Sequence, residues 1–190
     1  PVGEGILEYG RQVWEAWSQK NLSIWKLSHG SLTDAERQQC LDNHLGVMGK
    51  ETGKEQGKKF ADTAVGTLFF LCHGNSPQLI GQFTSGTDPW SQRTDWLQRS
   101  YRVLKAAQRN DRYTANSKYW SPQGNTTFWQ VGADDLLEFV STFLKRYFGT
   151  DLAELAMLAG EPIDAVSLGN GIAPPSPALA QLAVSRPVAP

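Results

Sequence analysis

The continuous apolar run at residues 67–72, with the sequence TLFFLC, constrains the fold of this chain more than any other stretch. A short apolar run beside a turn is typical of a buried strand, and turn-forming residues follow at 73–77. Residues 78–85 then return as a second strand that pairs with the first. The sequence therefore predicts a β-hairpin whose first strand is buried.

Other elements are predicted on both sides of this hairpin. Strands are expected at 23–28, 43–48, 101–107 and 126–131. Helices are expected at 4–20, 33–41 and 134–148, the last ending at Gly149. The polar segment 49–59 contains three glycines and is expected to be a loop or mobile lid. Because hairpins dominate and helices flank them, we expect an α+β domain with a mostly antiparallel, curved sheet or small barrel.

The composition of the chain changes near residue 150. Six of the ten prolines lie in residues 162–190, and no aromatic residue follows Phe148. We therefore expect a folded domain at 1–150 and a Pro/Ala-rich linker or tail at 151–190. A linker there predicts that another domain follows, and a flexible natural terminus is the alternative.

Composition also excludes several classes of protein. Hydrophobic residues make up 40% of the chain and charged residues 19%, which is typical of a globular domain. No apolar stretch approaches the ~20 residues of a spanning helix and no signal peptide opens the chain, so we expect no membrane association. Cys40 and Cys72 do not form a disulfide framework, which favours the reducing cytoplasm. The net charge of −1 means that nucleic-acid binding would require a local basic patch.

Signatures of catalysis are missing from the sequence. It contains no Gly-x-Ser-x-Gly, His-Glu-x-x-His or Cys-x-x-Cys motif. Lys54, in the glycine-containing segment 49–54, is not followed by the Ser or Thr of a phosphate-binding loop. We interpret Cys40 and His44 as a buried thiol and a surface or pocket imidazole rather than as metal ligands. We therefore expect a binding domain that is not an enzyme by itself and has no catalytic residue, metal or cofactor.

Two stretches of the chain concentrate positive charge, one within residues 50–59 and one within 93–112. If both reach one face of the fold, they form a local patch suited to phosphates, and a solvated surface is the alternative. The residues that we select for phosphate binding are Lys50, Lys54, Lys58, Lys59, Arg93 and Arg99.

Three of the seven tryptophans are candidates for a base-binding pocket. Trp25 lies on the first predicted strand, whereas Trp90 and Trp96 lie in a polar loop, where packing gives less reason for an indole. Indole faces can sandwich a planar base or accept a methyl group. We expect Trp25 to form one wall and Trp90 or Trp96 the other. The candidates for hydrogen bonds to the base edge are Ser28, His29, Asn43 and His44.

The order of these features resembles that of EVE and YTH domains, which belong to the PUA-like group. SIWKLSHG at 23–30 resembles their opening strand, in which a tryptophan begins the pocket. GTLFFL at 66–71 and LIGQFTS at 79–85 resemble their hydrophobic strand and the strand that returns beside it. YRVL at 101–104 resembles the strand that follows, so the resemblance covers about residues 20–148.

The resemblance implies a PUA-like, barrel-like fold that accepts a modified base in an aromatic pocket. Recognition of methylated duplex DNA would then require base flipping. The resemblance further implies the N-terminal DNA-recognition domain of a cytoplasmic, McrB-type modification-dependent restriction protein, with an AAA+ GTPase domain downstream. An RNA-binding module of the same fold, a protein-interaction domain and a metal-dependent enzyme using His29 and His44 are the alternatives.

Overall fold

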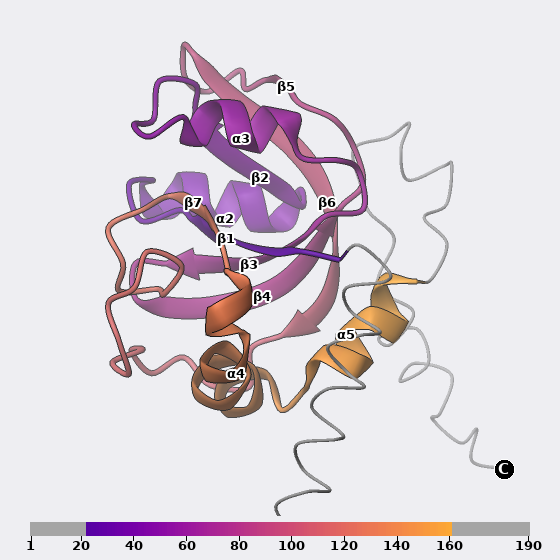
Figure 1. Ribbon diagram of the computed structural model, residues 1–190. Helices are drawn as coiled ribbons and strands as arrows, with labels where there is room; N and C mark the ends of the chain where they lie inside the picture. The colour runs from indigo at the N-terminus through magenta and orange to yellow at the C-terminus, as the bar shows by residue number, and fades with distance from the viewer. Residues whose placement is uncertain (1–21, 161–190) are drawn as a thin grey trace, which may run out of the picture.

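The computed structural model describes residues 22–160, which form one strongly curled sheet with flanking helices (Figure 1). The strands are β1 (Ile24–Ser28), β2 (Leu45–Gly49), β3 (Leu68–His73), β4 (Ser76–Phe83), β5 (Asp88–Pro89), β6 (Trp96–Ala106) and β7 (Phe128–Gln130). The helical elements are α2 (Asp34–Asp42), α3 (Gln56–Asp62), η1 (Ala133–Asp135), α4 (Leu136–Phe139), η2 (Val140–Phe148) and α5 (Leu152–Ala159). The expected α+β class with a curved sheet is confirmed.

The strands follow the order β2-β6-β4-β3-β1-β7, with β5 paired to β6. The predicted hairpin is the β3–β4 pair, and every pairing except one is antiparallel. The exception is the interior pair β1–β3, which is parallel. Between β1 and β3 the chain passes through α2, β2 and α3. This long crossover connection lets β3 run in the same direction as β1. The sheet is therefore mixed, a feature that local turn patterns do not reveal.

Two hydrophobic cores lie on opposite faces of the sheet. Leu68 and Phe70 of β3 belong to the outer core, which packs against α4, η2 and α5. Phe69 and Leu71 belong to the inner core, which also includes Phe60 of α3. Because β3 is buried on both faces, its sequence is continuously apolar instead of alternating.

Side chains fill the inside of the curled sheet. A methyl group at Gly46 would lie 2.9 Å from Leu27 Cδ2 and 3.3 Å from Phe83 Cε1. A methyl group at Gly81 would lie 2.7 Å from the ring of Phe69. These glycines let strands approach closely, and the interior at these positions is packed core.

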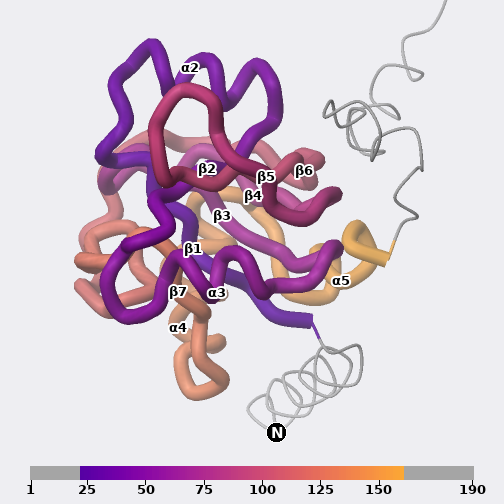
Figure 2. Tube along the Cα trace, turned by 90° about the horizontal axis from the view of Figure 1, so that it is seen from above, coloured from indigo at the N-terminus to yellow at the C-terminus, as the bar shows by residue number. Residues whose placement is uncertain are grey.

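Side chains also connect the edges of the curled sheet to neighbouring elements. The Nε2 atom of His29, just after β1, accepts a hydrogen bond of 3.1 Å from the amide of Val47 in the edge strand β2. At the other edge, Gln56 Oε1 accepts hydrogen bonds from the amides of Thr127 and Phe128, at 2.8 and 2.9 Å. Figure 2 shows α3, which carries Gln56, beside β7. The free edge of β7 is thus covered by a helix.

The helix after β1 has the expected capping box. Glu36 donates its amide hydrogen to Thr33 Oγ1, and the Thr33 amide donates to the Glu36 carboxylate. The expectation of a loop or lid throughout 49–59 is wrong, because α3 begins at Gln56. Phe60 anchors this helix in the inner core, so tertiary packing stabilises a segment whose sequence is polar and rich in glycine.

The helix predicted at 134–148 consists of a 3₁₀ turn, a short α-helix and the π-helical segment η2. It ends as expected at Gly149, whose φ of 57° lies in the left-handed region. Beyond it, Leu152 and Leu155 of α5 are buried in the outer core, although 151–190 was expected to be a linker or tail. The rest of that expected tail and the helix predicted at 4–20 lie outside the described residues.

Candidate nucleic-acid interface

Trp25, the expected first wall of a base pocket, lies half-buried in β1. Its ring stacks on that of Phe128 in β7, with centroids 4.6 Å apart and planes within 8°. Its indole nitrogen donates a 3.3 Å hydrogen bond to Ser23 Oγ. One face of the indole is therefore already occupied by a core phenylalanine.

Trp90 and Trp96, the expected second wall, belong to a separate cluster with Leu32, Cys40 and Val47. Their ring centroids are 5.6 Å apart, and the side chain of Trp90 is buried. Within residues 22–160, the ring contact of Trp25 is with Phe128 and not with either of these tryptophans. The structure thus places the three indoles in two different aromatic groups.

His29 and Ser28, expected at the base edge, lie at the end of β1. His29 is buried, and burial together with His73 and Arg37 lowers its pKa to about 3. Its ring is neutral near pH 7, and its Nε2 atom is occupied by the Val47 amide. Ser28 Oγ accepts a 3.3 Å hydrogen bond from the Gly30 amide. Both side chains support the turn and the closure of the sheet.

Asn43 and His44, the other base-edge candidates, end α2. The Asn43 side chain donates to Gln39 O at 2.8 Å, which satisfies a terminal carbonyl of that helix. His44 has a left-handed backbone, with φ of 51°, and its ring stacks on Tyr101 at 5.5 Å. These contacts give both residues a role in connecting α2 to β2.

The two arginines selected for phosphate binding are engaged within the fold. Arg93 forms a two-point ion pair with Glu36, at 2.8 and 2.6 Å, and its guanidinium lies 4.6 Å from the centroid of the Trp96 ring. Arg99 is buried, and it donates to Ser85 O and Phe60 O at 3.0 and 2.9 Å. Burial lowers the pKa of Arg99 to about 10. Arg93 therefore connects α2 to the β5–β6 loop, and Arg99 organises the interior.

The lysines of residues 50–59 lie instead at the surface, and two of them meet aromatic rings. Lys54 Nζ lies 3.8 Å from the centroid of Tyr119, and Lys59 Nζ lies 4.8 Å from that of Trp129. The two rings meet edge to face, with centroids 4.9 Å apart. We call these four residues the aromatic–lysine face. It combines cations with stacking surfaces, the two groups that nucleic-acid grooves use.

Hydrogen bonds fix the loop that carries Tyr119. The carbonyl of Tyr119 accepts a hydrogen bond from the Thr126 hydroxyl. The buried amine of Lys26 donates to Gly124 O at 2.6 Å and to Thr126 Oγ1 at 3.3 Å. Burial lowers the pKa of Lys26 to about 8. The exposed ring of Tyr119 is thus held on a loop anchored from within the sheet.

The lysine side of the face is fixed through α3. Gln56 Nε2 donates to Gly53 O at 2.7 Å, while its Oε1 atom holds the β7 backbone. A methyl group at Gly57 would lie 2.0 Å from Lys50 O, so the loop packs closely against the first turn of α3. Lys54, Lys59 and Trp129 therefore belong to one connected unit.

The electrostatics of the face are moderately positive. Lys54 lowers the pKa of the Tyr119 hydroxyl, mainly through a hydrogen bond. Residues 50–62 contain four lysines and three acids, a balance of +1. Lys58 is paired with Asp62 at 2.5 Å, and Lys50 is exposed. The face can therefore attract a phosphate locally, although the chain as a whole carries a charge of −1.

Sequence reasoning selected the two lysines of this face but missed Tyr119 and Trp129. The strand at 126–131 was predicted, and alternation along it places Phe128 and Trp129 on opposite faces. That alternation was the available signal for Trp129. Tyr119 lies in a long loop, where no periodic pattern indicates the direction of a side chain.

The structure offers no metal-binding group in the part of the chain that it describes. Within residues 22–160, no cluster of three or more His, Cys, Asp or Glu side chains has the proximity to hold an ion. Cys40 and Cys72 are buried, and burial raises the pKa of each thiol to about 12. Both thiols are therefore unreactive at neutral pH. The same residues include no helix of the length and apolarity that crossing a bilayer requires.

Comparisons with known proteins do not extend these observations. No protein-family model matches the sequence, and no curated protein matches it. The fold is a curled mixed sheet with flanking helices, which is compatible with a small barrel-like domain.

Proposed function

We propose that this domain binds nucleic acid through the aromatic–lysine face and that its ligand is duplex DNA carrying a methylated base. The observation that carries the proposal is the placement of Lys54 over the exposed ring of Tyr119 and of Lys59 over the partly buried ring of Trp129. Stacking of a base on an aromatic ring contributes roughly 1–3 kcal/mol, and lysines bind the adjoining phosphates.

The preference for a modified base and for duplex DNA comes from the sequence resemblance to EVE and YTH domains. A PUA-like assignment is part of the proposal, and the curled sheet with flanking helices is compatible with it. In this proposal a base leaves the duplex, which costs a few kcal/mol, and stacks against the face, where Lys54 and Lys59 now lie over Tyr119 and Trp129. Trp25 remains the candidate wall for the modified group, on the side that does not contact Phe128.

We base the proposed biological setting on the same resemblance. The domain would be the cytoplasmic recognition module of a modification-dependent restriction protein, joined to a downstream AAA+ GTPase. Nuclease and nucleotide hydrolysis would then belong to other domains or subunits. An isolated domain is expected to bind DNA without cleaving it.

The proposal is tested by titrating the chain with matched duplexes that are unmodified or carry 5-methylcytosine, 5-hydroxymethylcytosine or 6-methyladenine. We expect the Trp129→Ala variant to lose roughly tenfold or more in affinity, the loss of one stacking contact. Met157→Ala is the matched control, because Met157 is exposed on α5 and is not part of the face. This control is expected to bind like the wild type.

The outcomes separate the alternatives. Preference for one modified duplex, together with loss in Trp129→Ala, supports the proposal and names the base. Equal binding to all duplexes, with tighter binding to RNA of the same sequence, would replace it with an RNA-binding function. Absence of binding at both low and moderate salt would favour a protein-interaction domain. Binding that Trp129→Ala leaves unchanged would overturn the assignment of the aromatic–lysine face as the DNA-binding surface.

A further inference from the structure

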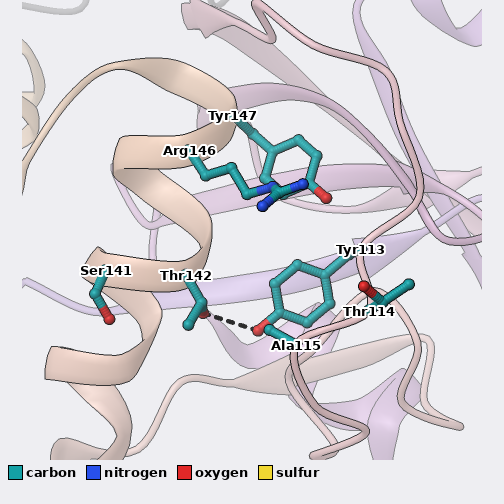
Figure 3. Close-up of a pocket in the computed structure, with 7 residues that line it drawn as sticks. All are labelled: Tyr113, Thr114, Ala115, Ser141, Thr142, Arg146 and Tyr147. Carbon is teal, nitrogen blue, oxygen red and sulfur yellow. Dashed lines mark hydrogen bonds between the residues drawn. The ribbon is translucent and has the colours of Figure 1, made fainter.

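A second site lies apart from the aromatic–lysine face, in a cavity between the loop after β6 and the π-helical segment η2 (Figure 3). Its volume is about 380 Å³, within the range of small-ligand pockets. The lining is formed by Tyr113, Thr114, Ala115, Ser141, Thr142, Arg146 and Tyr147. It therefore combines hydroxyl groups, two aromatic rings and one guanidinium, without a carboxylate.

Hydrogen bonds hold the two walls of the cavity together. The hydroxyls of Tyr113 and Thr142 lie 2.9 Å apart and share a hydrogen bond, drawn in Figure 3. Asn116 Nδ2 donates to the same Tyr113 oxygen at 2.8 Å. The amide of Gln108 donates to Tyr147 O at 2.7 Å, which joins the loop backbone to the helix. The cavity is thus preformed by contacts between segments distant in sequence.

The helix geometry explains why these side chains gather. In a π-helix the backbone hydrogen bonds connect residues i and i+5. Such segments are rare, and those that occur often lie at functional sites. Ser141 and Arg146 are five residues apart, as are Thr142 and Tyr147. In η2 the Thr142 hydroxyl, the Arg146 guanidinium and the Tyr147 ring lie on the side of the helix that faces Tyr113 (Figure 3).

The charge around the cavity is positive. Asp111, outside the lining, is shared between Arg146 at 3.1 Å and Arg109 at 2.8 Å. These two guanidiniums hold the pKa of the Asp111 carboxyl below its usual range. Arg112 and Lys145 add two exposed cations nearby in sequence.

Glu138, in α4, is a second acid outside the lining, and its carboxylate is engaged by Lys118 at 2.5 Å and Asn116 at 2.8 Å. Asp111 is therefore a single carboxylate shared by two arginines, Arg109 and Arg146. An incoming anion can pair with Arg146 while Arg109 keeps Asp111.

We propose that this cavity binds the phosphate group of a nucleotide, carried either by a free mononucleotide or by a nucleic-acid chain. The phosphate pairs with the Arg146 guanidinium, and the volume leaves room for the sugar beside Thr114. This site does not require the nucleic-acid function proposed for the aromatic–lysine face.

The test is a titration of the full chain with adenosine 5′-monophosphate, adenosine and inorganic phosphate, followed by calorimetry and by amide chemical shifts. Adenosine monophosphate is expected to bind more tightly than adenosine and to shift amides of 113–115 and 141–147. Arg146→Gln is expected to weaken this binding about tenfold or more, because it removes a charge-assisted contact. Lys105→Gln is the matched control, since it removes a cation that is paired with Glu154 outside the lining, and we expect a change of about twofold or less.

A 5′-phosphorylated oligonucleotide distinguishes the two sources of the phosphate. Shifts at 141–147 with the oligonucleotide assign the site to a chain, and shifts with the mononucleotide alone assign it to a free ligand. The proposal is overturned if adenosine binds as well as its monophosphate, if Arg146→Gln binds like the wild type, or if none of the phosphates shifts these amides. A failure of the function proposed for the aromatic–lysine face would be seen separately, as DNA binding that the Trp129→Ala variant leaves unchanged.

Discussion

Buried polar side chains in this domain stabilise the fold through uncharged partners. Arg99 donates to backbone carbonyls and lies 4.2 Å from the centroid of the Phe83 ring. Lys26 donates to Gly124 O and the Thr126 hydroxyl, and His29 accepts from the Val47 amide. Each of these residues has a polar head that satisfies backbone or loop groups inside the sheet. Polar residue types that suggest ligand contacts in a sequence therefore serve packing here.

His29 makes the stability of the domain dependent on pH. Its pKa is about 3 in the folded chain against 6.5 ordinarily, mainly because of burial. The unfolded chain therefore binds more protons between these values, so the stabilising contribution is complete above about pH 6.5 and is lost as pH falls. We expect the free energy of unfolding to fall by up to about 3 kcal/mol through His29 between pH 7 and pH 4. Chemical denaturation at a series of pH values measures this.

The His29→Gln variant separates this effect from other titrating groups. Glutamine retains an acceptor for the Val47 amide but does not titrate. Its unfolding free energy is expected to depend less steeply on pH than that of the wild type. Identical slopes for the two proteins would assign the acid sensitivity to other groups, such as His73, whose pKa burial lowers to about 4.

At the scale of elements, α3 is the part that makes the curled sheet and the aromatic–lysine face one unit. Its Phe60 packs in the inner core and its Gln56 bonds two amides at the edge of β7. It also carries Lys59, which lies over Trp129. The same helix therefore closes the sheet edge and positions the face.

Replacement of Gln56 by alanine is expected to destabilise the domain. It leaves the amides of Thr127 and Phe128 without their acceptor at a buried position, at a cost of about 1–3 kcal/mol for each unsatisfied group. Gln38→Ala is the control, because Gln38 is exposed on α2 and its side chain donates a hydrogen bond to Asp42 on the same helix. Thermal or urea unfolding compares the two. A loss in Gln56→Ala no larger than in Gln38→Ala would contradict the bridging role.

At the scale of the whole molecule, charge is nearly balanced and binding must be local. The chain carries 18 basic and 19 acidic residues, so no long-range field draws it toward a polyanion. Arg93 and Arg99 are engaged internally, which leaves the lysines of 50–59 as the cations nearest the aromatic rings.

The salt dependence of DNA binding is therefore expected to be shallow. Contacts with two to four phosphates predict a slope of log K against log salt of about −2 to −4. Lys59→Gln should reduce the magnitude of that slope by about 1, because one phosphate contact is lost. Lys105→Gln removes a lysine that is paired with Glu154 and should leave the slope unchanged. Titrations at four salt concentrations measure this, and equal slopes for the wild type and Lys59→Gln would exclude Lys59 from the interface.

Local patterns predicted most of the elements. The apolar run at 67–72, the capping residues Thr33 and Glu36, and the amphipathic segment ending at Gly149 correspond to β3, α2 and the η1–η2 region. Their structure depends on neighbours within a few residues, so the sequence alone contains the information. The helix α3 was missed because Phe60 stabilises it through the core and not through local propensity.

What the sequence by itself determined is the α+β class, the β3–β4 hairpin and the positions of the charged and aromatic residues along the chain. The tertiary structure decided which of them meet. Trp25 and Trp90 are separated into different clusters, whereas Lys54 meets Tyr119, 65 positions further along the chain. The physical reason is that the parallel β1–β3 pairing and the curl of the sheet bring distant segments together, and no local pattern encodes such a contact.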